Sequence, residues 1–331
     1  MDTVYTLLLY YLICGIDEDD IFIMSGGIPK EIRKNIKHIY FPHVKHTDIP
    51  DSNMILIVLK RLLLLIKRNC GIIKLRILLF FKTRGCEVEV YGQGHTNFSF
   101  PLYEYENSYI IEDGLGNYMN LVEPDYSQSR LLKFLGSYTN DIYEGFGTHK
   151  NIKKVYLTKN EVPDIIKDKV EVINMQKIWQ GLNENEKNEI LEIFNINLNE
   201  IDFKDETVLI LTEPLTEEKF ISLEDELEIY SNIIKKFNEK NIIIKPHPRD
   251  LKNYCEIFPN NTIIDKYFPI ELLNLIGIEP GIACSMVSTA LLNFKKSKIY
   301  VYDGELKNEI LIRARNDLIT LIKKENMELI S

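Results

Sequence analysis

The sequence has little of what marks several large classes of protein. Its five cysteines are scattered singly, without a CxxC pair or a metal-ligand spacing, which argues against a disulfide framework and a zinc site. The apolar run at residues 7–13 is too short to span a bilayer, and no basic segment precedes it as in a secretory signal. The GxGxxG spacing of a dinucleotide fold is missing as well. We therefore expect a protein of the reducing cytoplasm.

An excess of positive charge is also missing. The 331 residues include 40 Lys and Arg against 49 Asp and Glu, a net charge of −9, which argues against nucleic acid as a partner. With 45% hydrophobic and 27% charged residues the chain can bury a core, and its length favours two domains. A polar stretch at residues 183–205 marks the boundary, so we expect an N-terminal domain at 1–180, a connector at 181–205 and a C-terminal domain at 206–331. The last helix either stays in the C-terminal domain or returns to the N-terminal one.

Apolar runs that end in Gly or Pro turns alternate with stretches of helical periodicity. This alternation predicts an α/β protein with two Rossmann-like domains that face each other across a cleft. Thr3 is placed to cap the first helix with its hydroxyl. Strands are expected at residues 20–24, 88–91, 109–112, 207–211, 242–244 and 299–302, and helices at residues 5–13, 29–36, 54–68 and 223–237.

Residues 59–84 include eight basic side chains and no acidic one, interleaved with Leu, Ile and Phe. Two interpretations are open. The segment forms a pair of core helices whose basic edges reach solvent, or it lies on an anionic membrane surface. The second interpretation would place the protein peripherally on the cytoplasmic face of the inner membrane.

In open α/β sheets, ligands bind at the carboxyl ends of the strands, and polar motifs stand at four of the predicted strand ends. Glu112-Asp113-Gly114 lets the chain turn sharply and presents a carboxylate that can act as a general base. In Gly92-Gln93-Gly94-His95 the glycines allow a ligand to approach the backbone. Each of these two motifs, by itself, is also compatible with an ordinary turn.

The third motif, Lys245-Pro246-His247-Pro248-Arg249, combines a histidine with two cations on a backbone that two prolines restrict. This combination suits the binding and protonation of an anion. A rigid surface loop is the alternative.

The fourth motif consists of the hydroxyls of Ser285, Ser288 and Thr289 at an expected helix start. Hydroxyls and free amides in this position can bind a phosphate or a carboxylate. Simple capping of the helix is the alternative.

The order and context of these motifs resemble a known family. The segments 112–118 (EDGLGNY), 211–215 (LTEPL) and 244–250 (IKPHPRD), followed by Ser288 and Thr289, are similar to motifs of the bacterial sialyltransferases. The similarity is greatest to glycosyltransferase family 52, the lipooligosaccharide sialyltransferases, and it covers residues 3–302. It implies a GT-B fold, an inverting mechanism that needs no metal and no cofactor, and CMP-sialic acid as the donor.

The same resemblance implies roles for individual residues. His247 is expected to be the general acid at the donor phosphate, and Ser288 and Thr289 to hold the phosphate or the sugar carboxylate. Glu271 is expected to bind the cytidine ribose. The other residues assigned to the nucleotide site are Thr212, Lys245, Pro246, Pro248, Arg249 and Ser285. The residues assigned to the acceptor side are Glu112, Gly114, Gln93 and His95.

Two carboxylates compete for the role of general base. Related sialyltransferases use the aspartate of the acidic-glycine motif, here Asp113. In family 52 an aspartate ahead of the His-Pro strand has this role, and Asp225 corresponds to it. Position favours Asp113, because it follows a strand of the domain that binds the acceptor in GT-B enzymes.

In one respect the sequence departs from the family. Family members begin with a hydrophobic strand before the first helix, whereas this sequence starts at that helix. Either this strand is truncated or another segment replaces it.

The resemblance predicts transfer of sialic acid, with α-2,3 linkage, to a terminal galactose of a bacterial surface glycan such as lipooligosaccharide or capsule. The acceptor is an oligosaccharide or a lipid-linked glycan, and a homodimer is left open beside a monomer. Two other interpretations remain: a CDP-alcohol phosphotransferase of the teichoic-acid type, and a non-catalytic binding protein with the same fold.

Overall fold

The protein consists of two compact units, Met1–Asn195 and Ile196–Ser331. Its structure, a computed structural model, describes residues 1–41, 54–94, 96, 99, 105–118, 144–160, 162–196, 203, 206–238 and 240–331. The connector expected at 181–205 contains the helix α7 (Glu184–Ile193), which belongs to the first unit. An Asn183 cap and Glu186 form a capping box at the start of this helix.

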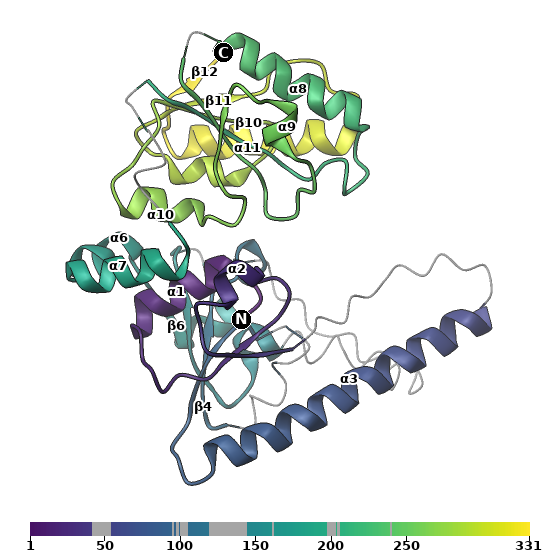
Figure 1. The fold of residues 1–331 in the computed structure, drawn as a ribbon, viewed down its shortest axis with the longest axis vertical. Helices are drawn as coiled ribbons and strands as arrows, with labels where there is room; N and C mark the ends of the chain where they lie inside the picture. Colours follow the sequence, from purple (N-terminus) through teal and green to yellow (C-terminus); the bar gives the residue numbers. More distant parts are fainter. Residues whose placement is uncertain are drawn as a thin grey trace. The chain divides into compact units, whose positions relative to one another are not determined.

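The first unit contains two parallel sheets (Figure 1). One has the strand order β1-β2 and the other the order β3-β4-β5-β6. The strands are β1 (Phe22–Met24), β2 (His38–Tyr40), β3 (Glu89–Gly92), β4 (Asn107–Ile111), β5 (Ile152–Leu157) and β6 (Val170–Val172). In the larger sheet, successive strands of the chain are neighbours, so the polar turns that follow β3, β4 and β5 lie at one edge of the sheet.

The first helix, α1 (Val4–Cys14), is capped as predicted, because the Thr3 hydroxyl oxygen accepts the Thr6 amide at 3.2 Å. Its centre is buried on all sides, as a run of leucines and tyrosines indicates. The other helices of this unit are α2 (Lys30–Arg33), α3 (Met54–Thr83), η2 (Leu115–Tyr118), η3 (Glu144–Thr148), η4 (Asp164–Lys169), α6 (Met175–Gly181) and α7.

The interpretation of the basic segment as a pair of core helices is wrong, because α3 is one continuous helix of 30 residues. The residue that could have broken it, Gly71, lies against the Phe41 ring: a Cβ added there would come within 2.8 Å of it. Leu75 and Leu79 pack in a core cluster with Ile23 and Phe41. None of the helices in the described part of the chain has the length and apolar content needed to cross a membrane.

The second unit is built on one parallel sheet with the order β12-β11-β10-β7-β8-β9. Its strands are β7 (Val208–Leu211), β8 (Ile242–Lys245), β9 (Thr262–Ile263), β10 (Ile282–Ser285), β11 (Lys298–Val301) and β12 (Leu329–Ile330). When β7 is numbered 1 and the later strands follow in chain order, the sheet has the order 6-5-4-1-2-3. This is the doubly wound order 3-2-1-4-5-6 read from the opposite edge, so the topological switch point lies between β7 and β10. Ligands of such sheets bind at the carboxyl ends of the strands beside that point.

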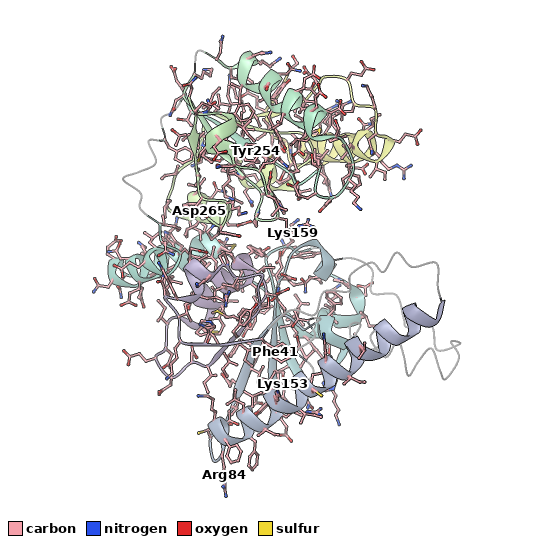
Figure 2. All side chains as sticks on the ribbon, turned by 45° about the vertical axis from the view of Figure 1, so that its right-hand side comes forward. Phe41, Arg84, Lys153, Lys159, Tyr254 and Asp265 are labelled. Atoms are coloured by element: carbon pink, nitrogen blue, oxygen red, sulfur yellow. The ribbon has the colours of Figure 1, made fainter. Side chains whose placement is uncertain are left out.

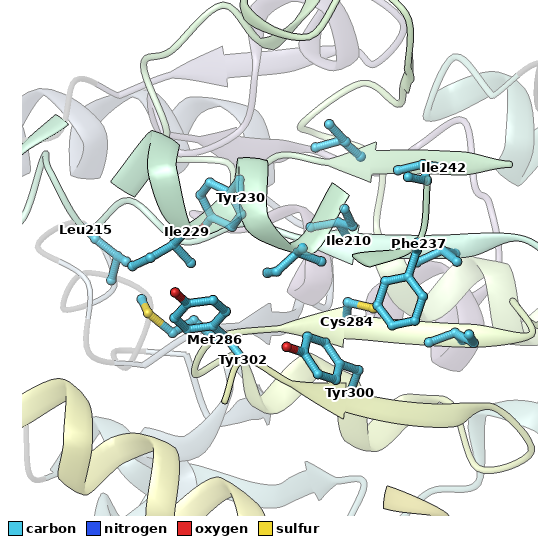
Figure 3. Packing of buried hydrophobic residues seen from close by; sticks show 14 of the residues in the cluster. Ile210, Leu215, Ile229, Tyr230, Phe237, Ile242, Cys284, Met286, Tyr300 and Tyr302 are labelled. Atoms are coloured by element: carbon cyan, nitrogen blue, oxygen red, sulfur yellow. The ribbon is translucent and has the colours of Figure 1, made fainter. Parts of the chain in front are cut away.

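The core of the second unit explains why its central strands read as unbroken apolar runs. Every residue of β7, β8 and β10 is buried. Figure 3 shows Ile229 and Tyr230 of α8 beside Ile210 of β7, with Tyr300 of β11 in the same cluster. The helices are α8 (Leu223–Lys236), α9 (Tyr254–Ile257), α10 (Ile270–Leu275), η6 (Thr289–Asn293) and α11 (Glu309–Lys324).

The last helix stays in the second unit. After α11 the chain enters β12, which pairs in parallel with β11.

Candidate active site

Asp113 comes two residues after the end of β4 and is held by three side chains from two segments of the first unit. Its Oδ1 accepts hydrogen bonds from Thr3 Oγ1 at 2.9 Å and from Thr6 Oγ1 at 3.3 Å. Gln93, which follows β3, donates its Nε2 hydrogen to the same oxygen. The half-buried carboxylate therefore has a defined orientation, as a positioned general base requires.

The neighbouring Glu112 is buried, with 3% of its surface exposed. Its Oε2 accepts hydrogen bonds from the Thr158 amide at 2.6 Å, the Thr158 hydroxyl at 2.8 Å and the Tyr118 hydroxyl at 2.5 Å. The Tyr5 hydroxyl donates to Oε1 at 3.2 Å. Glu112 thus ties the end of β4 to α1, η2 and the end of β5, and it supports the turn in which Asp113 stands.

Gly114 makes the turn after Asp113 possible. Its φ is +127°, a backbone conformation that residues with a side chain rarely adopt. The turn is closed by Asn117, whose Oδ1 accepts the Asp113 amide at 2.9 Å. The conformation of the EDGLGNY segment is therefore set by its glycine and by its own polar side chains.

The two remaining candidates for the acceptor side are Gln93 and His95. Gln93 lies with Asp113, as described, and its Oε1 also accepts the Asp2 amide at 2.5 Å. His95 is outside the described residues. A cavity of about 850 Å³ in the first unit is lined by Gln93, by the ends of α1 and α3 and by parts of β1 and β3, but not by Glu112 or Asp113.

In the second unit, Thr212 and Asp250 hold the backbone of the His-Pro loop. Thr212, directly after β7, accepts the His247 amide on Oγ1 at 3.1 Å and donates its hydroxyl to Asp250 Oδ2 at 3.0 Å. Asp250 is fully buried and also accepts the Tyr254 hydroxyl at 2.8 Å. Because β7 and β8 are neighbours in the sheet, these bonds fix the loop after β8 against the end of β7.

The half-buried imidazole of His247 is held in a neutral form. Burial, and then the positive charges of Arg249 and Lys245, lower its pKa to about 4. The Arg249 amide donates to Nδ1 at 3.1 Å, so the neutral ring has its proton on Nε2. His247 therefore offers a hydrogen-bond donor at neutral pH, and a phosphate beside it would favour the charged ring.

The two cations of the loop differ. The Lys245 ammonium is buried and donates to the carbonyls of Pro246 and Lys266, both at 2.8 Å. Burial lowers the pKa of Lys245 to about 8, against the opposing charges of Glu271 and Asp265. The Arg249 side chain is 69% exposed and pairs with Glu218 at 2.6 Å. Arg249 is thus the cation that a ligand can reach directly, while Lys245 organises the loop.

The hydroxyl cluster lies after β10, at the switch point of the sheet. Ser285 is buried and donates its hydroxyl to Glu213 Oε1, which stands after β7. The Ser288 amide donates to Ser285 Oγ at 3.1 Å, and Ser288 Oγ accepts the Ala290 amide at 3.4 Å. The expected helix here is the five-residue 3₁₀-helix η6, whose first residue, Thr289, is exposed.

Two further candidates lie at helix starts. Glu271 is a half-buried residue in the first turn of α10. Asp225 is engaged in the cap of α8: the Ser222 hydroxyl donates to Asp225 Oδ2 at 2.6 Å and accepts the Asp225 amide at 3.1 Å. Of the loop prolines, Pro246 is buried and Pro248 is exposed.

Sequence reasoning missed the buried carboxylate of Glu213. It accepts hydrogen bonds from the Val287 amide at 3.1 Å and the Tyr230 hydroxyl at 2.9 Å, in addition to the one from Ser285. Burial raises its pKa to about 7. An acidic residue directly after a fully apolar strand is the signal that could have found it.

A second network was also missed. The Lys252 ammonium lies 2.9 Å from Glu217 Oε2, 3.1 Å from Glu226 Oε1 and 3.0 Å from Asp250 Oδ1. These ion pairs join the His-Pro loop to the start of α8. In the part of the chain that the structure describes, no three His, Cys, Asp or Glu side chains form a group that could hold a metal ion.

Parallel sheets with polar side chains at the ends of neighbouring strands are typical of doubly wound α/β proteins, which bind ligands at these strand ends. The sequence matches the model of glycosyltransferase family 52 over residues 72–309. The chain therefore belongs to this family. An uncharacterized protein of Haemophilus influenzae is 33% identical over 234 residues, which are 70% of this chain and 73% of that protein.

Solved structures agree with this assignment at the level of the fold. An α/β-galactoside α-2,3-sialyltransferase from Photobacterium phosphoreum has a TM-score of 0.55 and 13% identity, covering 98% of this chain and 94% of its own. A 2,6-sialyltransferase from Photobacterium sp. JT-ISH-224, crystallised with CMP and lactose, has a TM-score of 0.56 and 13% identity, with 98% and 75% coverage. The GT-B domain of a Photobacterium damselae sialyltransferase has a TM-score of 0.52 and 11% identity, with 98% and 95% coverage. The fold is that of the GT-B class, as the sequence motifs predicted.

Proposed function

We propose that this glycosyltransferase is a sialyltransferase that moves sialic acid from CMP-sialic acid to a terminal galactose of a glycan, with inversion at the anomeric carbon. The main support is the placement of Thr212, His247 and Ser288 after three neighbouring strands, at the switch point of a doubly wound sheet. Three structural neighbours with TM-scores above 0.5 are sialyltransferases, one of them in a complex with CMP and lactose. We further propose that the new linkage is α-2,3.

In the second unit, the chemical task is to stabilise the leaving phosphate. As the bond between the anomeric carbon and the phosphate oxygen breaks, the electron pair stays on CMP, whose phosphate gains negative charge. The His247 Nε2–H, the Arg249 guanidinium and the hydroxyls of Ser288 and Thr289 are the donors for that charge. Donors that are fixed before the reaction stabilise the transition state more than the ground state.

In the first unit, the task is to remove the proton of the acceptor hydroxyl while its oxygen bonds to the anomeric carbon. We assign this proton to Asp113, because Thr3, Thr6 and Gln93 hold its carboxylate in place. Asp225 is the other candidate, and the Ser222 hydroxyl holds its carboxylate at the start of α8.

A direct assay tests the proposal. Incubation of the full chain with CMP-sialic acid and lactose should release CMP and yield a sialylated trisaccharide, and nuclear magnetic resonance of the product reports both linkage and anomeric configuration. A product only from a CDP-activated alcohol would replace the proposal with the teichoic-acid type of transfer. Binding of CMP without any transfer, to any acceptor tested, would leave a non-catalytic binding protein.

A further inference from the structure

The segment at residues 285–289, which we call the hydroxyl loop, has a buried side and an accessible side. Ser285 and Met286 are completely buried, and Figure 3 shows Met286 in the core cluster of the second unit. Ser288 is half-buried and Thr289 is exposed. A ligand can therefore reach the outer hydroxyls, while the inner residues attach the loop to the sheet.

Glu213, two residues after the end of β7, binds the buried side of the hydroxyl loop at two points. Its Oε1 accepts the Ser285 hydroxyl and, at 3.1 Å, the Val287 amide. Ser285 Oγ in turn accepts the Ser288 amide at 3.1 Å. Because β7 and β10 are the neighbouring strands of the switch point, one carboxylate joins the two strand ends and fixes the backbone that carries Ser288.

The helix α8 holds Glu213 from the other side. The Tyr230 hydroxyl donates to Glu213 Oε2 at 2.9 Å and accepts the Glu213 amide at 2.8 Å. The Tyr230 ring packs edge-to-face on Tyr254, with 6.1 Å between the ring centroids, and Figure 2 labels Tyr254 within the second unit. Tyr254 donates to Asp250 of the His-Pro loop. The same pair of tyrosines thus supports both loops at this edge of the sheet.

The environment of Glu213 also limits its repulsion of a bound anion. Burial raises the pKa of Glu213 to about 7, and the negative charge of Glu226 on α8 acts in the same direction, against the hydrogen bonds from Ser285, Val287 and Tyr230. A phosphate at the hydroxyl loop would raise this pKa further. Glu213 can therefore become neutral when an anion binds, and its oxygens still hold the loop.

We propose that Glu213 is a positioning residue for the donor phosphate, which orients the hydroxyl loop through its bonds to Ser285 and Val287. The inference rests on the proposed function, in which Ser288 and the residue after it bind the phosphate of CMP. Donors that are fixed before binding lose less conformational freedom when the ligand arrives. The ribose is assigned to Glu271 on a different segment, α10, so the effect of Glu213 should be confined to the phosphate.

Calorimetric titration of the full chain with CMP and with cytidine tests this proposal without an acceptor. We define the phosphate ratio as the Kd of cytidine divided by the Kd of CMP, and expect about ten or more in the wild type. Glu213→Ala and Ser285→Ala should each lower the phosphate ratio by about fivefold or more and leave the affinity for cytidine within about twofold. Glu213→Gln should keep most of the ratio, because the amide oxygen can still accept hydrogen bonds from the loop.

Ser297→Ala is the matched control for Ser285→Ala. Ser297 is also buried and donates its hydroxyl to the Pro280 carbonyl at 2.5 Å, but it precedes β11 and so lies at the amino ends of the strands. This variant loses a buried hydrogen bond of the same kind, and its phosphate ratio should equal that of the wild type.

Three results would overturn the proposal. A phosphate ratio that survives both Glu213→Ala and Ser285→Ala removes the positioning role and leaves the proposed transfer intact. Equal losses of CMP and cytidine affinity, or an equal loss in Ser297→Ala, show a role in stability alone. A wild type that binds CMP no more tightly than cytidine contradicts the phosphate site itself, and with it the proposed function. If Glu213→Ala fails to fold, Ser285→Ala decides.

Discussion

Gln93 donates a hydrogen bond to the Asp113 carboxylate, although the two residues follow different strands, β3 and β4. With Thr3 and Thr6, it fixes an oxygen of Asp113 in one direction. The first prediction is therefore that Asp113→Asn lowers kcat by about two to four orders of magnitude, the usual contribution of a general base. Steady-state kinetics with CMP-sialic acid and lactose measure this, and the KM for CMP-sialic acid should change little.

Asp225→Asn is the matched comparison for the same kinetics. Because Asp225 takes part in the cap of α8, we expect it to lower the free energy of unfolding by about 1 kcal/mol and to keep kcat within about threefold. A larger loss of kcat in Asp225→Asn than in Asp113→Asn would show that Asp225, and not Asp113, is the general base. If neither variant lost more than about tenfold, a single carboxylate base would be ruled out.

The second prediction concerns the proton of His247. In NMR titrations, the imidazole signal that disappears in His247→Ala should have a pKa of about 4, since burial and two cations oppose its charge. Addition of CMP should raise this pKa, because a nearby phosphate favours the imidazolium. A value near 6.5 in the free protein would contradict the environment described here.

The same variant tests the catalytic role of His247. We expect His247→Ala to fold and to lose about two to four orders of magnitude in kcat, as is usual for a group that assists the leaving group. An activity of a third or more of the wild-type kcat would remove His247 from the mechanism.

The third prediction is a pH dependence of stability caused by Glu213. Burial raises the pKa of Glu213 to about 7 in the folded protein, above its ordinary value of 4.5. The folded state therefore binds a proton that the unfolded state has lost, and this contribution to stability is full below pH 4.5 and disappears as pH rises through 7. A shift of this size corresponds to about 3 kcal/mol.

Urea unfolding of Glu213→Gln at several pH values measures this effect. The stability of the wild type relative to the variant should fall between about pH 5 and pH 8, because the neutral amide cannot ionise. Glu228→Gln, at an exposed position of α8, should have the same pH profile as the wild type. Parallel profiles for Glu213→Gln and the wild type would show that Glu213 does not titrate in this range.

The fourth prediction concerns the turn after Asp113. Gly114→Ala should destabilise the first unit by about 1 to 2 kcal/mol and lower kcat, because the φ of +127° is unfavourable for alanine. Among the described residues no heavy atom lies within 4 Å of the added Cβ, so the expected effect comes from backbone conformation. Thermal unfolding measures it, and a Gly114→Ala protein as stable as the wild type would contradict it.

Gly181→Ala provides the control for that substitution. Gly181 is the last residue of α6, its φ is not positive, and its added Cβ also meets no atom of the described part of the chain within 4 Å. This change should leave stability unchanged or raise it by up to about 1 kcal/mol.

The sequence alone determined the class of the protein and several of its strands and helices. Strands such as 242–244 are short apolar runs between polar turns, and such a run can be recognised from the local sequence alone. The polar motifs after these strands could be placed at one edge of a sheet because parallel strands all end there. Thr3 could be recognised as a cap, since capping depends on adjacent residues only.

Tertiary structure decided what each polar residue does at that edge. Glu112 and Asp113 are adjacent in sequence, but Glu112 is buried among partners from α1, η2 and β5 whereas Asp113 is held half-exposed by Thr3 and Gln93. Lys245 and Glu213 were invisible as buried groups, because burial depends on segments far away in the chain. The length of α3 likewise followed from its packing on Phe41 and Ile23, which holds a glycine-containing segment in one helix. Local sequence specifies which backbone a residue prefers, but only the packed units specify which side chains lose their water and which keep it.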